Sequence, residues 1–243
     1  MKFDENNLIV QLNGDGGDTA QRMGLYFSLL RMRDILGISN NNFIYSSTID
    51  YINAIKLLQV ESGIWRRHPT QWNSPKDFSR DQTISNVVAM GFCGLRNDLR
   101  NLFLAFKKRK FLFFQNNDIM TPTFVGAFIR SYYWSNNGFM IVLFSLILWP
   151  ILFWLDLCLV VEALIRCYKK GNDFDNVGDD LNTSLIILQA QFILPTPFAW
   201  FSAFIYSWLP LGVNHSFEWY FRPESGGNKE FVELARPLIN KYF

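Results

Sequence analysis

The sequence predicts an all-α protein, either a helical bundle or a partial α/α-toroid, with an apolar helical segment in contact with a membrane. Apolar residues recur at helical spacing along much of the chain, and no stretch shows the alternation that is typical of a strand. Of the 243 residues, 49% are hydrophobic and 18% are charged, which excludes a disordered chain. Because this length fits one domain, we expect residues 1–243 to form a single helical domain.

Capping residues and helix-breaking residues mark several helix ends in the sequence. Asp18 or Thr19 is expected to cap the first helix, and Gly37 follows its end. Ser79 and Gln82 have the spacing of a Ser-x-x-Gln capping box. Residues 65–78 contain two prolines and predict an irregular loop. The helices are therefore expected at 19–36, 48–60, 79–90, 95–114, 139–163, 182–192 and 229–242.

The segment 139–163 is apolar apart from Ser145, Pro150, Asp156 and Glu162. A helix needs about 20 apolar residues to cross the hydrocarbon core of a bilayer. An acidic residue inside such a span costs about 2.5–3.5 kcal/mol unless it is paired or lies near the end. We expect a membrane-spanning helix here, and a fully buried core helix is the alternative.

A second apolar segment covers residues 184–213. Its prolines, Pro195, Pro197 and Pro210, argue against one straight helix, so a re-entrant or interfacial piece is expected. The basic run at 107–110 lies between phenylalanines and suits an anionic membrane surface, with a solvated helix face as the alternative. If 139–163 spans the membrane, this run places the N-terminal side in the cytoplasm.

Charge and cysteine content exclude several other classes. A net charge of +2 with one short basic run argues against a nucleic-acid partner. The three cysteines form no CxxC pair, so a reducing compartment is expected, with neither a disulfide framework nor a structural zinc site. No cofactor is expected. The expected partners are a membrane or a hydrophobic protein, and a homo-oligomer would explain the apolar residues equally well.

Three polar loops carry the residues that are suited to chemistry. In 13–18, Asp15 and Asp18 lie among three glycines shortly before Arg22, where they can face a common pocket, although Asp18 is equally suited to capping the helix. The loop 65–82 concentrates charged, aromatic and amide side chains: Arg66, Arg67, His68, Trp72, Arg80, Asp81 and Gln82. Aromatic rings beside carboxylates and arginines suit a sugar. The third loop, 215–228, has similar residues, including Arg222, and an ordinary connection between helices is its alternative.

These loops resemble, weakly, those of glycan-active enzymes with an α/α-toroid fold. The resemblance depends on Asp15-Gly16-Gly17-Asp18, on His68-Pro69 and on Ser79-Arg80-Asp81-Gln82 ahead of a helix. The last stretch is similar to the Ser-Arg-Gly-Gln that opens a helix in unsaturated glucuronyl hydrolases. The resemblance implies paired helices with the functional loops at one end and activity on a glycan.

We therefore predict a membrane-associated hydrolase that acts on a glycan or another polar substrate. The predicted catalytic residues are Asp15, Asp18, His68 and Asp81, with two carboxylates serving as acid and base. The predicted substrate-binding residues are Arg22, Arg66, Arg67, Trp72, Arg80, Gln82 and Arg222. No metal is predicted, because the four catalytic residues lack a recognised ligand spacing. The alternative is a non-catalytic bacterial or bacteriophage membrane or virion component that docks a partner or forms an oligomer.

Overall fold

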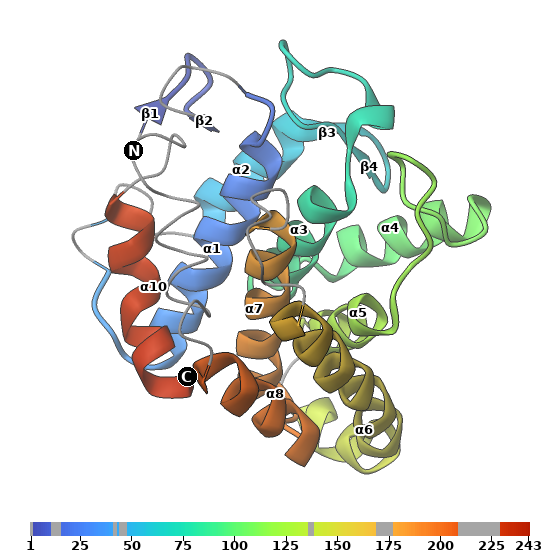
Figure 1. Ribbon diagram of the computed structural model, residues 1–243. Helices are drawn as coiled ribbons and strands as arrows, with labels where there is room; N and C mark the ends of the chain where they lie inside the picture. Colours follow the sequence, from blue (N-terminus) through green and yellow to red (C-terminus); the bar gives the residue numbers. More distant parts are fainter. Residues whose placement is uncertain are drawn as a thin grey trace.

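A computed structural model describes residues 2–10, 16–40, 43, 48–135, 139–168, 177–208 and 229–243. Most of these residues are helical, which confirms the all-α prediction (Figure 1). The helices are α1 (Thr19–Ile35), α2 (Thr48–Leu58), the short 3-10 helix η1 (Pro75–Asp77), α3 (Arg80–Phe92), α4 (Arg96–Lys108), α5 (Pro122–Trp134), α6 (Phe139–Tyr168), α7 (Val177–Phe192), α8 (Pro197–Trp208) and α10 (Lys229–Tyr242).

Two small antiparallel sheets correct the expectation that the chain has no strands. β1 (Lys2–Phe3) pairs with β2 (Ile9–Val10), and β3 (Gln59–Glu61) pairs with β4 (Ile64–Trp65). Strands of two or three residues are too short to show an alternating pattern. β3 also takes the place of the last residues of the expected helix at 48–60, which ends at Leu58.

Helix α5 was not expected, and helix α4 is shorter than expected. Thr121 caps α5 by accepting a hydrogen bond from the Phe124 backbone N–H at 3.3 Å, and Pro122 occupies the first helical position. α4 ends at Lys108 rather than at 114, because Lys110 and Phe111 adopt left-handed conformations with φ of 56° and 62°.

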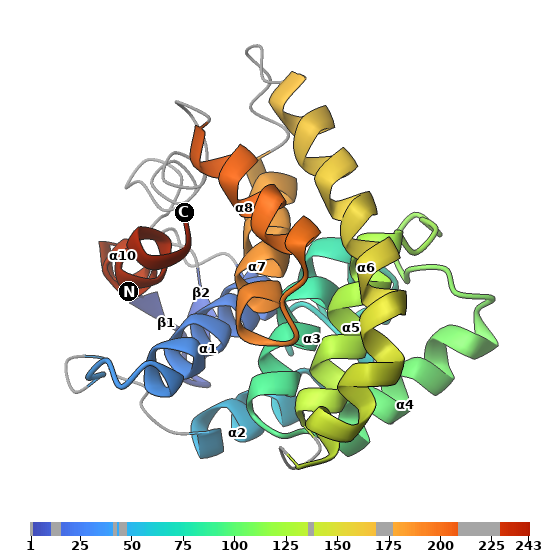
Figure 2. The same ribbon diagram turned by 90° about the horizontal axis from the view of Figure 1, so that it is seen from below.

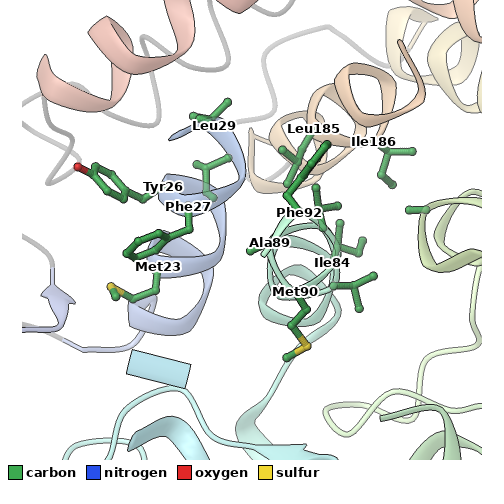
Figure 3. Close-up of a cluster of buried hydrophobic side chains, with 14 of the residues drawn as sticks. Met23, Tyr26, Phe27, Leu29, Ile84, Ala89, Met90, Phe92, Leu185 and Ile186 are labelled. Atoms are coloured by element: carbon green, nitrogen blue, oxygen red, sulfur yellow. The ribbon is translucent and has the colours of Figure 1, made fainter. Parts of the chain in front are cut away.

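Helices α1 and α3 lie at the centre of the molecule and pack closely against each other (Figure 2). Gly24 of α1 makes this approach possible, since a Cβ there would lie 2.6 Å from the backbone carbonyl carbon of Ser85. Figure 3 shows the surrounding core, with Tyr26 and Phe27 on α1, Phe92 on α3 and Leu185 on α7. The two helices therefore hold their N-terminal ends in a fixed relation.

Helix α6 contains the apolar segment expected at 139–163 and continues through Pro150 to Tyr168. It packs beside α5 and α8, as both ribbon views show (Figures 1 and 2). The break expected within 184–213 is present between α7 and α8, where Thr196 accepts a hydrogen bond from the Ala199 backbone N–H at 3.1 Å. Residues 209–213 lie outside the described part of the chain.

Candidate functional site

A polar pocket of about 330 Å³ lies where α1 and α3 begin. All of its lining residues are polar or charged: Asp18, Gln21, Arg67, Ser79, Arg80, Asp81, Gln82, Gln115, Asn116 and Asp118. Three carboxylates and two guanidinium groups therefore face one space. Five of the residues predicted to form a site line this pocket, namely Asp18, Arg67, Arg80, Asp81 and Gln82.

Gln82 of α3 connects the starts of the two helices. Its side-chain oxygen accepts a hydrogen bond from the Gln21 backbone N–H of α1 at 2.8 Å. Its amide nitrogen donates to the Gly17 carbonyl at 3.2 Å and lies 3.5 Å from a carboxylate oxygen of Asp18. Gln82 therefore satisfies a backbone donor in the first turn of α1, where a capping side chain normally does so.

Neither the expected side-chain cap of α1 at Asp18 nor the complete capping box at Ser79 and Gln82 is present. Asp18 occupies the N-cap position of α1, but its side chain makes no capping hydrogen bond. The Ser79 hydroxyl accepts from the Gln82 backbone N–H at 3.4 Å, which is one half of the expected capping box. The other half is replaced, because the Gln82 side chain turns toward α1. Asp18 lines the pocket, and one of its carboxylate oxygens lies 3.5 Å from the side-chain nitrogen of Gln82.

Asp81 lies in the first turn of α3 and lines the same pocket. One of its carboxylate oxygens accepts a hydrogen bond from the side-chain amide of Asn182 at 2.7 Å and lies 3.8 Å from Nε of Arg80. Asn182 is buried on α7, so Asp81 is held from the core side.

Arg67 lines the pocket and holds three neighbouring segments of the chain together. Its guanidinium donates to the backbone carbonyls of Gly17 and Asp77 and, at 2.6 Å, to the side-chain oxygen of Gln115. The same group lies 5.6 Å from the ring centre of Trp72. Arg67 thereby connects the segment before α1, the end of η1 and the loop after α4.

His68 does not line the pocket. Its side chain is 1% exposed, and its Nε2 lies 2.8 Å from a carboxylate oxygen of Asp4. Nδ1 accepts hydrogen bonds from the backbone N–H groups of Thr70 and Gln71 at 3.3 and 3.2 Å, so the proton belongs on Nε2. This geometry favours a structural role, in which His68 joins the β1–β2 turn to the loop 65–78.

The remaining predicted residues are placed elsewhere. Arg22 is buried in α1, and Arg66 donates to the Leu57 carbonyl at 3.3 Å. Neither of them lines the pocket, and nor does Trp72. Asp15 and Arg222, together with the rest of the loop 215–228, lie outside the described residues.

The loop after α4 supplies three lining residues that the sequence did not single out: Gln115, Asn116 and Asp118. Four consecutive amide or acidic residues at 115–118 follow an aromatic stretch, and this pattern was the signal in the sequence that could have identified them. Asn116 and Asn117 take left-handed conformations with φ of 58° and 54°, which asparagine adopts more readily than most residues. The Gln115 backbone N–H donates to the Phe78 carbonyl at 3.3 Å and holds the loop beside η1.

Within the described ranges, no group of three or more His, Cys, Asp or Glu side chains is placed to hold a metal ion. The mixed charges of the pocket are instead suited to a ligand that both donates and accepts hydrogen bonds. Burial raises the pKa of the half-buried Cys93 thiol to about 12, so this cysteine is protonated at neutral pH.

A second feature is the outer face of α6. Residues Ile147–Ile165 form a helix that is long and apolar enough to cross a membrane, a test that a core helix of a soluble protein also passes. Only 33% of this segment is buried inside the protein. The exposed residues of α6 and the neighbouring α8 include Ile147, Trp149, Ile151, Trp154, Val161, Leu164, Ile165, Trp200, Phe201 and Phe204.

The acidic residues of α6 face inward. Asp156 forms a two-point ion pair with Arg130 of α5, with N–O distances of 2.9 and 2.5 Å, and both side chains are at most 2% exposed. Thr196 donates to the same carboxylate at 2.6 Å. Glu162 accepts from Thr123 and Thr183 at 2.7 and 3.0 Å. The acid expected to weaken a membrane span is therefore paired inside the protein.

No protein-family model, no curated protein and no solved structure matches this chain.

Proposed function

We propose that this chain is a membrane-associated helical protein that binds a glycan or a similarly polar substrate in the pocket and hydrolyses it. One observation carries the proposal: Asp18 and Asp81, at the starts of two adjacent helices, line one pocket with Arg67 and Arg80. A partial α/α-toroid, with its functional loops gathered at one end, is part of this proposal.

The chemistry requires one carboxylic acid and one carboxylate on opposite sides of the bond to be cleaved. Asp18 and Asp81 are the proposed pair. Arg80 and the amide side chains of Gln21 and Asn116 would bind hydroxyl or carboxylate groups of the substrate. Arg67 would mainly hold the pocket in shape, since its guanidinium already bonds to three segments.

Membrane association is proposed from the outer face of α6, which offers exposed apolar side chains and no exposed charge between Ile147 and Ile165. Nineteen residues of helix cover about 28 Å, close to the hydrocarbon thickness of a bilayer. If α6 spans the membrane, the pocket belongs to the part that precedes it in the chain, which we propose to be cytoplasmic.

The test compares Asp81→Asn with Asp98→Asn. Both aspartates lie in the first turn of a helix, but Asp98 is on α4 and does not line the pocket. Asparagine keeps an oxygen that can accept from Asn182. With a panel of oligosaccharides that includes uronic-acid disaccharides, release of reducing ends should fall about 100-fold or more in Asp81→Asn and persist in Asp98→Asn.

Thermal unfolding of the same two variants separates catalysis from structure. We expect the midpoint of Asp81→Asn to stay within about 2 °C of the wild type. A large loss of stability in Asp81→Asn would indicate that this carboxylate supports the start of α3. A wild-type protein that cleaves and binds none of the glycans would contradict the hydrolase proposal.

The second candidate function is a non-catalytic membrane or virion component. It is favoured by the hydrogen bonds that Gln82, Arg67 and His68 make within the protein, because these connect segments that are distant in the sequence, as structural residues do. On this alternative the pocket residues are a structural network, and the exposed face of α6 binds a hydrophobic partner or a second copy of the chain. Asp18→Asn would then change stability and leave every binding assay unaffected.

A further inference from the structure

A second hollow, of about 740 Å³, lies between the β3–β4 hairpin and the C-terminal half of α4. We call it the basic groove. It is lined by Glu61, Ser62, Ile64, Asn101, Leu104, Ala105, Lys107, Lys108, Arg109 and Phe114. It shares no lining residue with the polar pocket, so its role can be considered separately.

Three consecutive residues in the lining of the basic groove are cationic. Lys107 and Lys108 form the last turn of α4, and Arg109 follows directly. Glu61 is the one acidic residue in the lining, so the groove carries a formal excess of two positive charges, from three basic residues and one acid. In the part of the chain that the structure describes, neither lysine is in an ion pair.

Arg109 is held in place through Nη2 of its guanidinium, and its Nε donor is not satisfied within the described part of the chain. Its guanidinium lies 4.7 Å from the ring centre of Phe114, and it donates to the Phe113 carbonyl at 3.2 Å and to the Asn117 side chain at 3.0 Å. Its Nε atom is buried and has no hydrogen-bond partner among the described residues. A buried donor without an acceptor is costly, and an anionic ligand would satisfy it.

The lining of the groove also includes apolar residues. Ile64, Leu104, Ala105 and Phe114 contribute to its lining, and Leu104 is 45% exposed. Next to it, Phe103 and Phe111 are also exposed, with ring centres 5.9 Å apart. Large apolar side chains beside a row of cations are typical of surfaces that bind the boundary between lipid headgroups and acyl chains.

We propose that the basic groove binds the acidic headgroup of an anionic membrane lipid. Lys107, Lys108 and Arg109 contact the phosphate, and Leu104 contacts the first part of the acyl chains. A free phosphate ion would leave the apolar residues of the groove in water, and a nucleic acid needs a longer track of basic residues than this. The proposal depends on the α4 surface alone and not on insertion of α6.

The experiment titrates the full-length protein, in neutral detergent where it needs one, with three probes, of which the two lipids are kept below their critical micelle concentrations. The probes are dihexanoyl phosphatidylglycerol, dihexanoyl phosphatidylcholine and inorganic phosphate. We expect the phosphatidylglycerol to bind at least about 10-fold more tightly than either of the others. Equal binding of all three probes, or binding of phosphate alone, would overturn the lipid assignment.

Charge-matched variants locate the binding site. Lys107→Gln with Lys108→Gln should weaken phosphatidylglycerol binding about 10-fold or more. Lys2→Gln with Lys76→Gln removes the same charge from exposed lysines outside the groove and should change the affinity less than about twofold. Equal losses in the two double variants would mean that net charge, not the groove, attracts the lipid.

A third variant tests whether the apolar residues of the basic groove contribute to lipid binding. Leu104→Ser should weaken phosphatidylglycerol binding and leave inorganic phosphate binding unchanged, because only the lipid contacts this side chain. If it has no effect on phosphatidylglycerol, the groove binds an anion and not an amphiphile. Failure here would leave the α6 proposal intact, since the short-chain lipids report on the groove without membrane insertion.

Discussion

Among single residues, Gln82 shows how one side chain sets the geometry of the candidate site. It satisfies a backbone donor of α1 while its own backbone N–H bonds to Ser79 at the start of α3. Gln82 performs the capping function at α1, whereas Asp18 makes no side-chain capping hydrogen bond and lines the pocket. The side chain of a glutamine in the first turn of a helix ordinarily accepts a hydrogen bond at the start of that same helix. Gln82 can bond to α1 instead because α1 and α3 are in close contact.

His68 illustrates the opposite outcome. The sequence indicates a reactive residue in a loop, but the side chain is buried and both ring nitrogens are hydrogen-bonded. Gly16 lies against the imidazole so closely that a Cβ there would be 2.5 Å from the ring. Nothing in a single sequence distinguishes a histidine that lines a pocket from one that holds two loops together.

We predict that His68→Ala lowers the free energy of unfolding by about 2–4 kcal/mol, because it removes buried hydrogen bonds and opens a cavity. Chemical denaturation of the purified protein measures this loss. Asp4→Asn, which keeps an acceptor for Nε2, should cost less. A stable His68→Ala protein that has lost only substrate turnover would instead support the catalytic role predicted from the sequence.

Among the secondary-structure elements, the contact between α1 and α3 is the feature on which the polar pocket depends. Gly24 faces the backbone of Ser85 and Asn86, and the Asn86 side chain donates to the carbonyls of Ala20 and Gln82 at 2.8 and 2.7 Å. Tyr51 of α2 donates to the Asn86 side-chain oxygen at 2.8 Å. Buried polar groups therefore set the alignment of the two helices in addition to their apolar contacts.

Gly24→Ala should push the two helices apart and destabilise the protein by about 1–3 kcal/mol. Gly126→Ala is the matched control, since this glycine also lies within a helix but a Cβ there would be 3.5 Å from its nearest neighbour. The control should be neutral or stabilising by up to about 1 kcal/mol. Thermal unfolding compares the two, and equal midpoints would contradict the close packing at Gly24.

A second pair of elements, α5 and α6, is joined by the ion pair between Arg130 and Asp156. Arg130→Met should cost about 3–5 kcal/mol, because it leaves a buried carboxylate without its charged partner. Adding Asp156→Leu should recover most of this loss, since no unpaired charge then remains. Denaturant titration of the two variants measures the difference. If the single variant is as stable as the wild type, water reaches the pair.

Some of these helices could be predicted from the sequence, and others could not. Helices α1, α3 and α10 have apolar periodicity and recognisable ends, so they were predicted close to their observed positions. α5 was not predicted, although Thr121 and Pro122 give it a recognisable start, with an N-cap residue followed by a proline at the first helical position. The pocket was predictable in part: Asp18 and Asp81 stand out locally, whereas the contribution of Gln115–Asp118 depends on contacts between distant segments.

At the scale of the whole molecule, polarity is distributed unusually around α6. Its acidic residues are on the inner side, bonded to α5, α7 and the segment before α8, while large apolar residues cover its exposed side. In a water-soluble protein, charged residues usually occupy the exposed side of a helix. Residues 147–165 are long and apolar enough to cross a membrane, a test that the core helix of a soluble protein also passes. We propose lipid as the environment of this face, and a protein partner is the alternative.

Membrane fractionation tests that environment. We expect the wild-type protein to resist extraction by alkaline carbonate and to be released by detergent. Ile151→Glu places a charge on the outer face of α6 and should release the protein into the carbonate fraction, because a charge in hydrocarbon costs about 2.5–3.5 kcal/mol. Ile49→Glu, at an exposed isoleucine of α2, is the control and should remain with the membrane.

If instead the wild-type protein is soluble without detergent, α6 must be covered by another protein surface. A second copy of the chain would then be the simplest partner, and Ile151→Glu should convert the oligomer into a monomer in sedimentation experiments, while Ile49→Glu should not. Either result identifies the exposed apolar face of α6 as a contact surface. The two results differ in what lies beside the part of the chain that forms the polar pocket: a bilayer in the first case, and a neighbouring subunit in the second.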